Sequence, residues 1–190
     1  MRIMIEMKEK LTGTRIYLQK PEVSFEFAKK MFAVVDANRD IIMPWLEWAL
    51  PTITKSAEDD FAFAYEADKA WKTGERFEYP IYDINNDEFL GIIGVIKRGK
   101  DRNLAFELGY WLKKDAWKKG YIQEAIKLVE DELFAQGIVR ITIRADVENE
   151  NSNKTAQKAG YTFEGTLKKS HYNMCLHQFR DLNLYSKTKA

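Results

Sequence analysis

Cysteine is almost absent from this sequence, with Cys175 alone among 190 residues. A single thiol excludes an internal disulfide framework and a cysteine-rich zinc site, so we expect no bound metal and a reducing environment. Long apolar runs are also missing, and charged residues are spread through the first ten positions. Neither feature suits a membrane span or a secretory leader. The sequence therefore predicts a soluble, cytoplasmic protein that has no membrane partner.

An excess of charge of one sign is missing too. The 30 lysines and arginines nearly balance 29 acidic residues, which gives a formal net charge of +1. A chain without a bulk positive charge has no general attraction for nucleic acid, so we expect no such partner and any basic site must be local. Repeats, low-complexity tracts and linkers are absent as well, and the length suits a single domain, residues 1–190.

What the sequence does contain is a regular succession of apolar patterns. Helical spacing begins at Pro21 and again behind Ser56, a natural N-cap of a helix that runs to about Trp71. Residues 85–87, Asn-Asn-Asp, favour a hairpin turn. Prolines bracket the aromatic-rich segment 41–51, so we expect a packed loop there. Strands are expected at 14–19, 77–84, 88–96, 104–112, 138–147, 161–169 and 176–186, and further helices from Ile122 to a closing Gly137 and at 152–159.

The stretch from Glu107 to Gly137 carries the clearest chemical signal. The strand from Leu104 to Leu112 places its even-numbered residues on one apolar face, and a loop with four lysines then closes on Gly120 immediately before a helix. The first turn of a helix has unpaired N–H groups and the positive end of the dipole, which suits a phosphate or pyrophosphate. A solvated basic loop is the alternative on this stretch alone. Together with the strand at 138–147, the stretch predicts a βαβ unit with two parallel strands.

These motifs together resemble the GNAT acetyltransferases, specifically the RimJ/RimL-like branch that acetylates protein N-terminal amines. The resemblance covers nearly the whole chain, and its specificity lies in the order and spacing of several motifs. It implies an α/β (α+β) GNAT fold, with a mixed, mostly antiparallel sheet of about seven strands, helices on both faces and a central βαβ cofactor unit. The motifs are the tryptophan-rich loop at 43–48, the strand at 108–112, the loop and helix start at 117–125, Asn-x-x-Ser at 149–152, Gly-Tyr at 160–161, Glu-Gly at 164–165, and the final strand at 179–186.

The resemblance implies acetyl-coenzyme A (acetyl-CoA) as the cosubstrate. Two positions depart from the family pattern, with Lys118 where glycine is frequent and Ile122 where glycine or alanine is usual. Neither removes a backbone N–H, so we expect the cofactor still to bind. Asn149 is implied as a partner of the pantetheine arm, and a plain turn residue is its alternative role. The arm is expected along Tyr110, Trp111 and Leu112, and the pyrophosphate over Trp117, Lys118, Lys119, Gly120, Tyr121, Ile122 and Gln123.

Acetyl transfer to an amine needs a base for the amine and a proton donor for the departing thiolate. In the family branch, a glutamate proposed as the base follows the motif serine by nineteen residues, and the same count from Ser152 reaches His171. Histidine is the side-chain type that titrates nearest neutral pH, although a solvent-exposed histidine at a strand end is the alternative. Ser152 is implied as the donor to the thiolate and as a coenzyme A contact. It is also a natural N-cap for the helix that follows.

The acceptor region is the least determined by the sequence. Trp45, Trp48 and Tyr172 are expected to wall the acceptor cleft, although aromatics in a proline-bounded loop also pack against cores. Glu47 is an acid that could attract a cationic amine. By resemblance, we expect direct attack by a protein N-terminal α-amine in a ternary complex, and a homodimer. A small-molecule amine such as an antibiotic, or a coenzyme A sensor with little turnover, are the open alternatives.

Overall fold

The computed structural model describes residues 5–99 and 105–189. Within these residues, eight strands form one sheet in the order β1-β2-β3-β4-β5-β6-β8-β7. β5 and β6 run parallel, and the other neighbours run antiparallel. The mixed, mostly antiparallel sheet is as predicted, with one strand more because a short β1 (Lys10–Thr12) pairs with β2 (Ile16–Gln19). The other strands are β3 (Arg76–Asp83), β4 (Phe89–Arg98), β5 (Ala105–Leu112), β6 (Arg140–Asp146), β7 (Thr162–Asn173) and β8 (Gln178–Thr188).

The four predicted helices are present in the predicted order, with two corrected beginnings, and the short α2 is a helix that the sequence did not predict. α1 starts at Phe25 and not at Pro21, because the Ser24 side chain accepts a hydrogen bond from the N–H of Phe27 at 3.2 Å and caps the helix there. α5 starts at residue 150, two positions before the predicted start, because Asn149 caps the helix. The helices are α1 (Phe25–Asp36), α2 (Arg39–Ile42), α3 (Ala57–Thr73), α4 (Tyr121–Ala135) and α5 (Glu150–Lys158), with single 3₁₀ turns η1 (Glu47–Ala49) and η2 (Lys114–Ala116).

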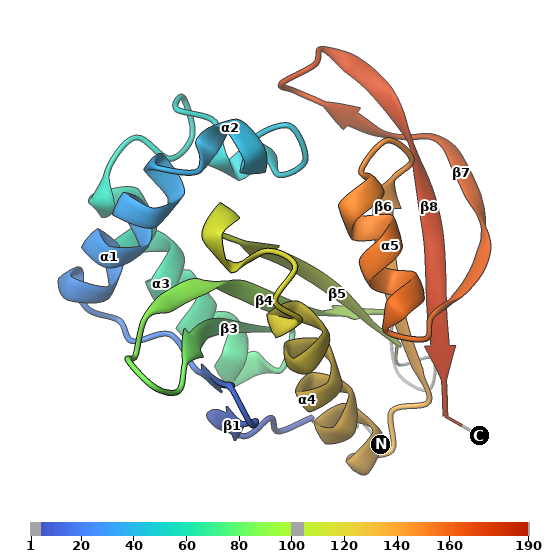
Figure 1. The fold of residues 1–190 in the computed structure, drawn as a ribbon, viewed down its shortest axis with the longest axis horizontal. Coiled ribbons are helices and arrows are strands. Elements are labelled where there is room, and N and C mark those ends of the chain that lie inside the picture. The colour runs from blue at the N-terminus through green and yellow to red at the C-terminus, as the bar shows by residue number, and fades with distance from the viewer. Residues whose placement is uncertain (1–4, 100–104, 190) are drawn as a thin grey trace.

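The two faces of the sheet are covered by different helices (Figure 1). Even-numbered residues of β5, such as Phe106 and Leu108, join the larger core together with Ile126 and other residues of α4. Odd-numbered Trp111 joins a second core with residues of α1 and α3, including Met31. The predicted alternation along β5 is thus confirmed from residue 106 onward, whereas Leu104 lies outside the described residues. One face of β5 therefore packs against α4, and the other packs against α1 and α3.

The predicted βαβ unit is present. β5 and β6 are parallel, and α4 connects them between two left-handed glycines, Gly120 (φ 79°) before it and Gly137 (φ 83°) after it. The hairpin of β3 and β4 is also as predicted. Segment 41–51 is packed as predicted, with Ile42 and Ala49 buried in the second core, but it is not all loop because it contains the end of α2 and the turn η1. In the part of the chain that the structure describes, no helix is long and apolar enough to cross a membrane.

Candidate active site

The site lies where β5 and β6 separate. The two strands pair only between residues 106–108 of β5 and 141–143 of β6, although β5 continues to Leu112 and β6 to Asp146. Residues 109–112 therefore have one backbone edge that β6 does not pair. A cleft of about 1410 Å³ opens at this divergence and is lined by segment 41–46, β5, the start of α4, β6, α5 and β7. Pockets for one drug-sized ligand reach about 1,000 Å³, so this cleft can admit two substrates together.

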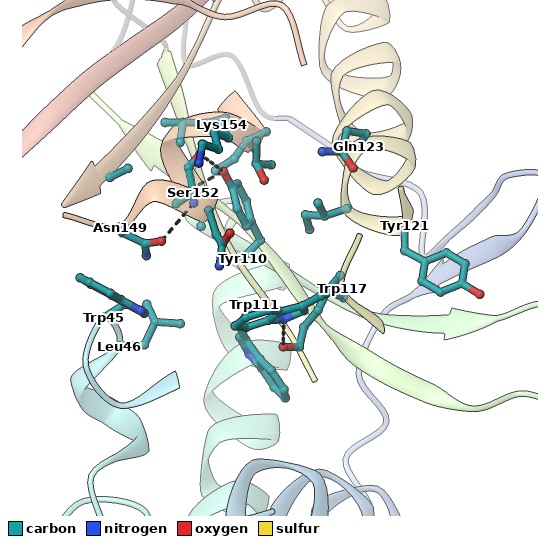
Figure 2. A pocket seen from close by; sticks show the side chains of 18 of the residues that line it. Trp45, Leu46, Tyr110, Trp111, Trp117, Tyr121, Gln123, Asn149, Ser152 and Lys154 are labelled. Atoms are coloured by element: carbon teal, nitrogen blue, oxygen red, sulfur yellow. Dashed lines mark hydrogen bonds between the residues drawn. The ribbon is translucent and has the colours of Figure 1, made fainter. Parts of the chain in front are cut away.

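The open edge of β5 is suited to a ligand that carries amide groups. Backbone N–H and C=O groups at a strand edge pair with an extended peptide-like chain as another strand would. Tyr110, Trp111 and Leu112 line the cleft as predicted. The indole Nε1 of Trp117 donates to the Leu112 carbonyl at 2.9 Å and so connects the end of this edge to the loop before α4 (Figure 2). The pantetheine arm of coenzyme A contains two such amides.

The N-terminus of α4 opens onto the same cleft. Gly120 caps the helix in a left-handed conformation and provides no side-chain cap, so the first-turn N–H groups stay available to an anion. Lys118 is also left-handed, with a φ of 60°, which gives a physical reason for the glycine that the family pattern often has there. Lys119 does not line the cleft, and the Tyr121 side chain points away from the centre of the site and donates to Asp83 at 2.9 Å (Figure 2).

Arg15 holds this loop in place and was not anticipated from the sequence. Its Nη1 donates to the carbonyl of Lys119 at 2.6 Å, and its Nη2 donates to that of Gly120 at 3.2 Å. Its Nε donates to Glu124 Oε2 at 2.8 Å, while Glu124 Oε1 accepts the N–H groups of Thr14 and Arg15 at 2.6 and 2.9 Å. The turn between β1 and β2 is thereby joined to the start of α4. A sequence pattern gives no sign of a contact between residues so far apart.

Ser152 and Tyr110 meet at the centre of the cleft (Figure 2). Their hydroxyl oxygens lie 3.3 Å apart, and either can donate. The prediction that Ser152 caps α5 is wrong, because Asn149 is the cap and its side-chain oxygen accepts the N–H of Ser152 at 3.0 Å. The Ser152 hydroxyl is therefore not used by the helix. Burial raises the pKa of Tyr110 to about 12, against the opposing influence of the Ser152 hydrogen bond, so the phenol keeps its proton at neutral pH.

His171 lines the other side of the cleft, on β7. Its Nε2 lies 3.5 Å from Glu47 Oε1, and the same carboxylate oxygen accepts the N–H of Met174 at 2.6 Å. Asn173 adds a second connection by donating to the Pro44 carbonyl at 2.8 Å. The tip of the β7–β8 hairpin is thus joined to segment 41–51 above the cleft. His171 gains a carboxylate partner that orients its ring.

The carboxylates that line the cleft are already engaged. Burial raises the pKa of Asp146, but hydrogen bonds from Arg180, two at 2.8 Å, and from the Glu148 N–H outweigh it and hold the pKa below its usual value. Such an ion pair is a poor proton acceptor at neutral pH. His171 is the histidine of the cleft lining, and a neutral imidazole can accept a proton through one ring nitrogen. The lining carboxylates and their arginine partners are Asp146 with Arg180, Glu107 with Arg144, and Glu124 with Arg15.

The three predicted acceptor aromatics lie in different places. Trp45 lines the cleft. Trp48 packs its ring against Trp111, with centroids 5.7 Å apart, and contributes to the second core. Tyr172 is 46% exposed and contacts Phe179, outside the cleft lining. Alternation along β7 explains the last result, because the neighbour of His171 in a strand points to the opposite face.

A comparison with known protein families identifies the family of this chain. Residues 15–162 match the family described as "Acetyltransferase (GNAT) domain". The chain belongs to the GNAT acetyltransferase family. Its members transfer an acetyl group from acetyl-CoA to an amine, and the open β5 edge and the α4 N-terminus fit that cosubstrate. The family, the enzyme class and the cosubstrate predicted from the motifs are therefore confirmed.

Similar proteins include enzymes that act on ribosomal proteins. The acetyltransferase is 25% identical over 171 residues to the ribosomal-protein-serine acetyltransferase of Escherichia coli K12, covering 90% of this chain and 92% of the relative. Its fold is similar to RimL, a ribosomal L7/L12 α-N-protein acetyltransferase solved with coenzyme A, with a TM-score of 0.84, 21% identity, and coverage of 95% and 98% of the two chains. It is also similar to the microcin C7 self-immunity acetyltransferase MccE, solved with acetyl-CoA and AMP, with a TM-score of 0.81, 22% identity, and coverage of 93% and 94%.

Proposed function

We propose that this acetyltransferase modifies the α-amine of a protein N-terminus, in a ternary complex in which the amine attacks the thioester directly. One observation carries the proposal: residues of both faces of β5 line the cleft, with the α4 N-terminus on the side of the larger core and segment 41–46 on the side of the second core. Donor and acceptor can then meet between β5 and β6 from opposite sides. The similarity to a ribosomal-protein-serine acetyltransferase over 92% of its length supports a protein acceptor.

Donor binding is assigned to backbone groups and three side chains. Residues 110–112 pair with the pantetheine amides along the open edge of β5, and the N–H groups at residues 121–123 receive the pyrophosphate. Asn149 uses its side-chain oxygen for the α5 cap, so its amide nitrogen is the group that donates to the arm. Acetyl-CoA supplies the activated acetyl group when bound. The loop cations Lys118 and Lys119 add long-range attraction for the phosphates.

Proton transfer is assigned to groups on the two sides of the cleft. With its Nε2 facing Glu47, His171 presents Nδ1 to the incoming ammonium and accepts its proton, and the Glu47 carboxylate stabilises the imidazolium that results. Ser152 donates to the departing thiolate, and the Tyr110 hydroxyl, 3.3 Å away, re-supplies that proton. The ammonium thus loses its first proton to His171, which later releases it to water. After the attack the nitrogen loses a second proton, which returns to the Tyr110–Ser152 hydroxyl pair and replaces the proton that Ser152 gives to the thiolate.

The proposal is tested by following thiol release from acetyl-CoA with three acceptors. These are a peptide with a free α-amine, the same peptide blocked at its α-amine but containing lysine, and a small amine. We expect efficient release only with the first. Preference for the small amine would replace the proposal with the antibiotic-type alternative. Thermal stabilisation by acetyl-CoA without release with any acceptor would favour the sensor.

We further propose that the enzyme is a cytoplasmic homodimer. The unpaired thiol of Cys175 is compatible with a reducing compartment. Exposed apolar side chains on β7 and β8, with Phe163 53% and Phe179 62% exposed, are the surface that a second copy would cover. Sedimentation analysis should give twice the 22.2 kDa of one chain, and a monomer at micromolar concentration would refute the dimer.

A further inference from the structure

Neither the backbone conformation nor the packing of the protein requires a glycine at position 109. It lies in the interior of β5, where glycine weakens a strand because it adds backbone entropy and packs no side chain. Its φ is not left-handed, so the backbone conformation does not require glycine. Apart from Gly109 and its two chain neighbours, no heavy atom of the described residues lies within 4 Å of the position that a Cβ would occupy. Any small side chain would therefore fit there without a clash.

Two other glycines in strands, Gly91 and Gly94, have close contacts at the position that a Cβ would occupy. A Cβ on Gly91 would lie 2.1 Å from the carbonyl oxygen of Trp111, and its φ is 154°. A Cβ on Gly94, the neighbour of Gly109 on β4, would lie 2.6 Å from a carboxylate oxygen of the buried Glu78. Gly91 requires glycine because of its backbone contacts and its φ, and Gly94 leaves space for the carboxylate of the buried Glu78. Gly109 has no such contact, so the space above it is available to something outside the chain.

That space belongs to the acceptor half of the cleft. Gly109 lines the cleft and has the same parity on β5 as Trp111, which packs against Trp48 of segment 41–51. Tyr110, of opposite parity, faces Ser152 on the α5 side. The backbone at Gly109 therefore faces away from the α4 N-terminus. It faces the side of the cleft where segment 41–51 contacts the tip of the β7–β8 hairpin.

We infer that Gly109 is a specificity-determining residue for the acceptor. The peptide backbone that follows the acetylated α-amine crosses β5 in van der Waals contact with Gly109, and a side chain at this position excludes it. This inference rests on the proposed function. It places the chain of a peptide acceptor over Gly109, whereas an acceptor that ends near its amine does not reach this position.

Two variants at position 109 and one control test the inference. Gly109→Ala and Gly109→Val add increasing bulk to the bare position, and Ala105→Val adds bulk to the same face of the same strand but outside the cleft lining. Each is assayed with a hexapeptide that has a free α-amine and with the amide of its first residue alone. Binding is measured for coenzyme A and for a conjugate in which the hexapeptide α-amine is joined to coenzyme A through an acetyl linker.

For Gly109→Val we expect the KM for the hexapeptide to rise about tenfold or more, because overpacking a contact excludes the ligand. The conjugate should lose affinity by a similar factor. The KM for acetyl-CoA, the affinity for coenzyme A and turnover of the one-residue amide should stay within about twofold of wild type. Gly109→Ala should show a smaller effect in the same direction, and Ala105→Val none. Because alanine meets no atom of the protein at this position, the alanine variant keeps the test valid if the valine variant fails to fold.

The inference is overturned if the wild-type protein acetylates the hexapeptide and both Gly109 variants do so equally well. It is also overturned if the hexapeptide and the one-residue amide lose turnover to the same extent, since that result indicates distortion of the site. Failure of the proposed function gives a different result, in which the wild type itself acetylates no peptide and binds the conjugate no better than coenzyme A. That result refutes both statements together.

Discussion

Replacing Arg15 with alanine should weaken donor binding through the loop that Arg15 holds. The guanidinium makes three hydrogen bonds, to Glu124 and to the carbonyls of Lys119 and Gly120, at 2.8, 2.6 and 3.2 Å. Each is worth about 0.5 to 1.5 kcal/mol net, and the low end applies to a side chain that is 49% exposed. The three together contribute about 1.5 kcal/mol to the order of the loop, which corresponds to roughly a tenfold rise in the KM for acetyl-CoA.

The assay compares two donors. Acetyl-CoA reaches the loop with its pyrophosphate, whereas S-acetylpantetheine carries the same acetyl thioester and arm but has no pyrophosphate. Arg15→Ala should raise the KM for acetyl-CoA about tenfold while changing the KM for S-acetylpantetheine by less than about twofold. Arg15→Lys should recover part of the loss, because lysine keeps the charge but cannot donate in a fork to two carbonyls. Arg140→Ala is the matched control, since it breaks an arginine–glutamate pair outside the cleft.

Two results would refute this reasoning. An unchanged KM for acetyl-CoA in folded Arg15→Ala would mean that the loop keeps its conformation without the arginine. Equal losses with both donors would mean that Arg15 supports the fold as a whole and has no particular role at the phosphate loop. Thermal melting of the variant and of Arg140→Ala separates the second result from a general loss of stability.

Three further predictions follow from the site and its surroundings. His171→Gln should lower kcat by about 100-fold or more with little change in the KM for acetyl-CoA, and Glu47→Gln should lower it less; a wild-type rate in His171→Gln would rule out its role as the base. Ser152→Ala and Tyr110→Phe should each lower kcat by about tenfold, and the double variant should lose little more than Ser152→Ala because the two hydroxyls act in series; additive losses would contradict the relay. Asp60 is 2% exposed, its Oδ2 has no hydrogen-bond partner among the described residues, and burial raises its pKa to about 7 against the opposing influence of Arg39. Because the pKa is higher in the folded chain than its usual 3.8, the free energy of unfolding should fall as pH rises from about 4 to about 7 and stay low above that range. Asp60→Asn should therefore be more stable than wild type at pH 8 and differ less at pH 5, as measured by urea unfolding, and an identical pH dependence in the two proteins would contradict the assignment.

Local patterns in the sequence predicted the parts of the fold that local interactions determine. Alternation located β5 and β6, and glycines at 120 and 137 marked the ends of α4, because left-handed conformations favour glycine in any context. The Ser56 N-cap was predicted because a serine side chain caps a helix through hydrogen bonds to nearby backbone groups. The start of α5 was misplaced because Asn149 and Ser152 are both good cap residues, and only the structure shows which side chain accepts the backbone N–H.

Contacts between distant segments could not be read from the sequence. Nothing in the residues around Arg15 indicates that it bonds the loop before α4, and nothing around Glu47 indicates that it faces His171. We expected Trp48 and Tyr172 to wall the acceptor cleft, but packing against the second core and alternation along β7 place both outside the cleft lining. The donor half of the site was therefore more predictable than the acceptor half, because one contiguous stretch forms most of it.

The alternating faces of β5 have a consequence for how such an enzyme changes during evolution. Successive residues of one short strand contribute to different tasks, since Tyr110 belongs to the side of Ser152, whereas Gly109 and Trp111 belong to the side of segment 41–51. Under the role proposed for Gly109, a substitution at that position alters the choice of amine while the cosubstrate site keeps its shape. New acceptors can be acquired one residue at a time on this scaffold without rebuilding the machinery that holds the acetyl donor.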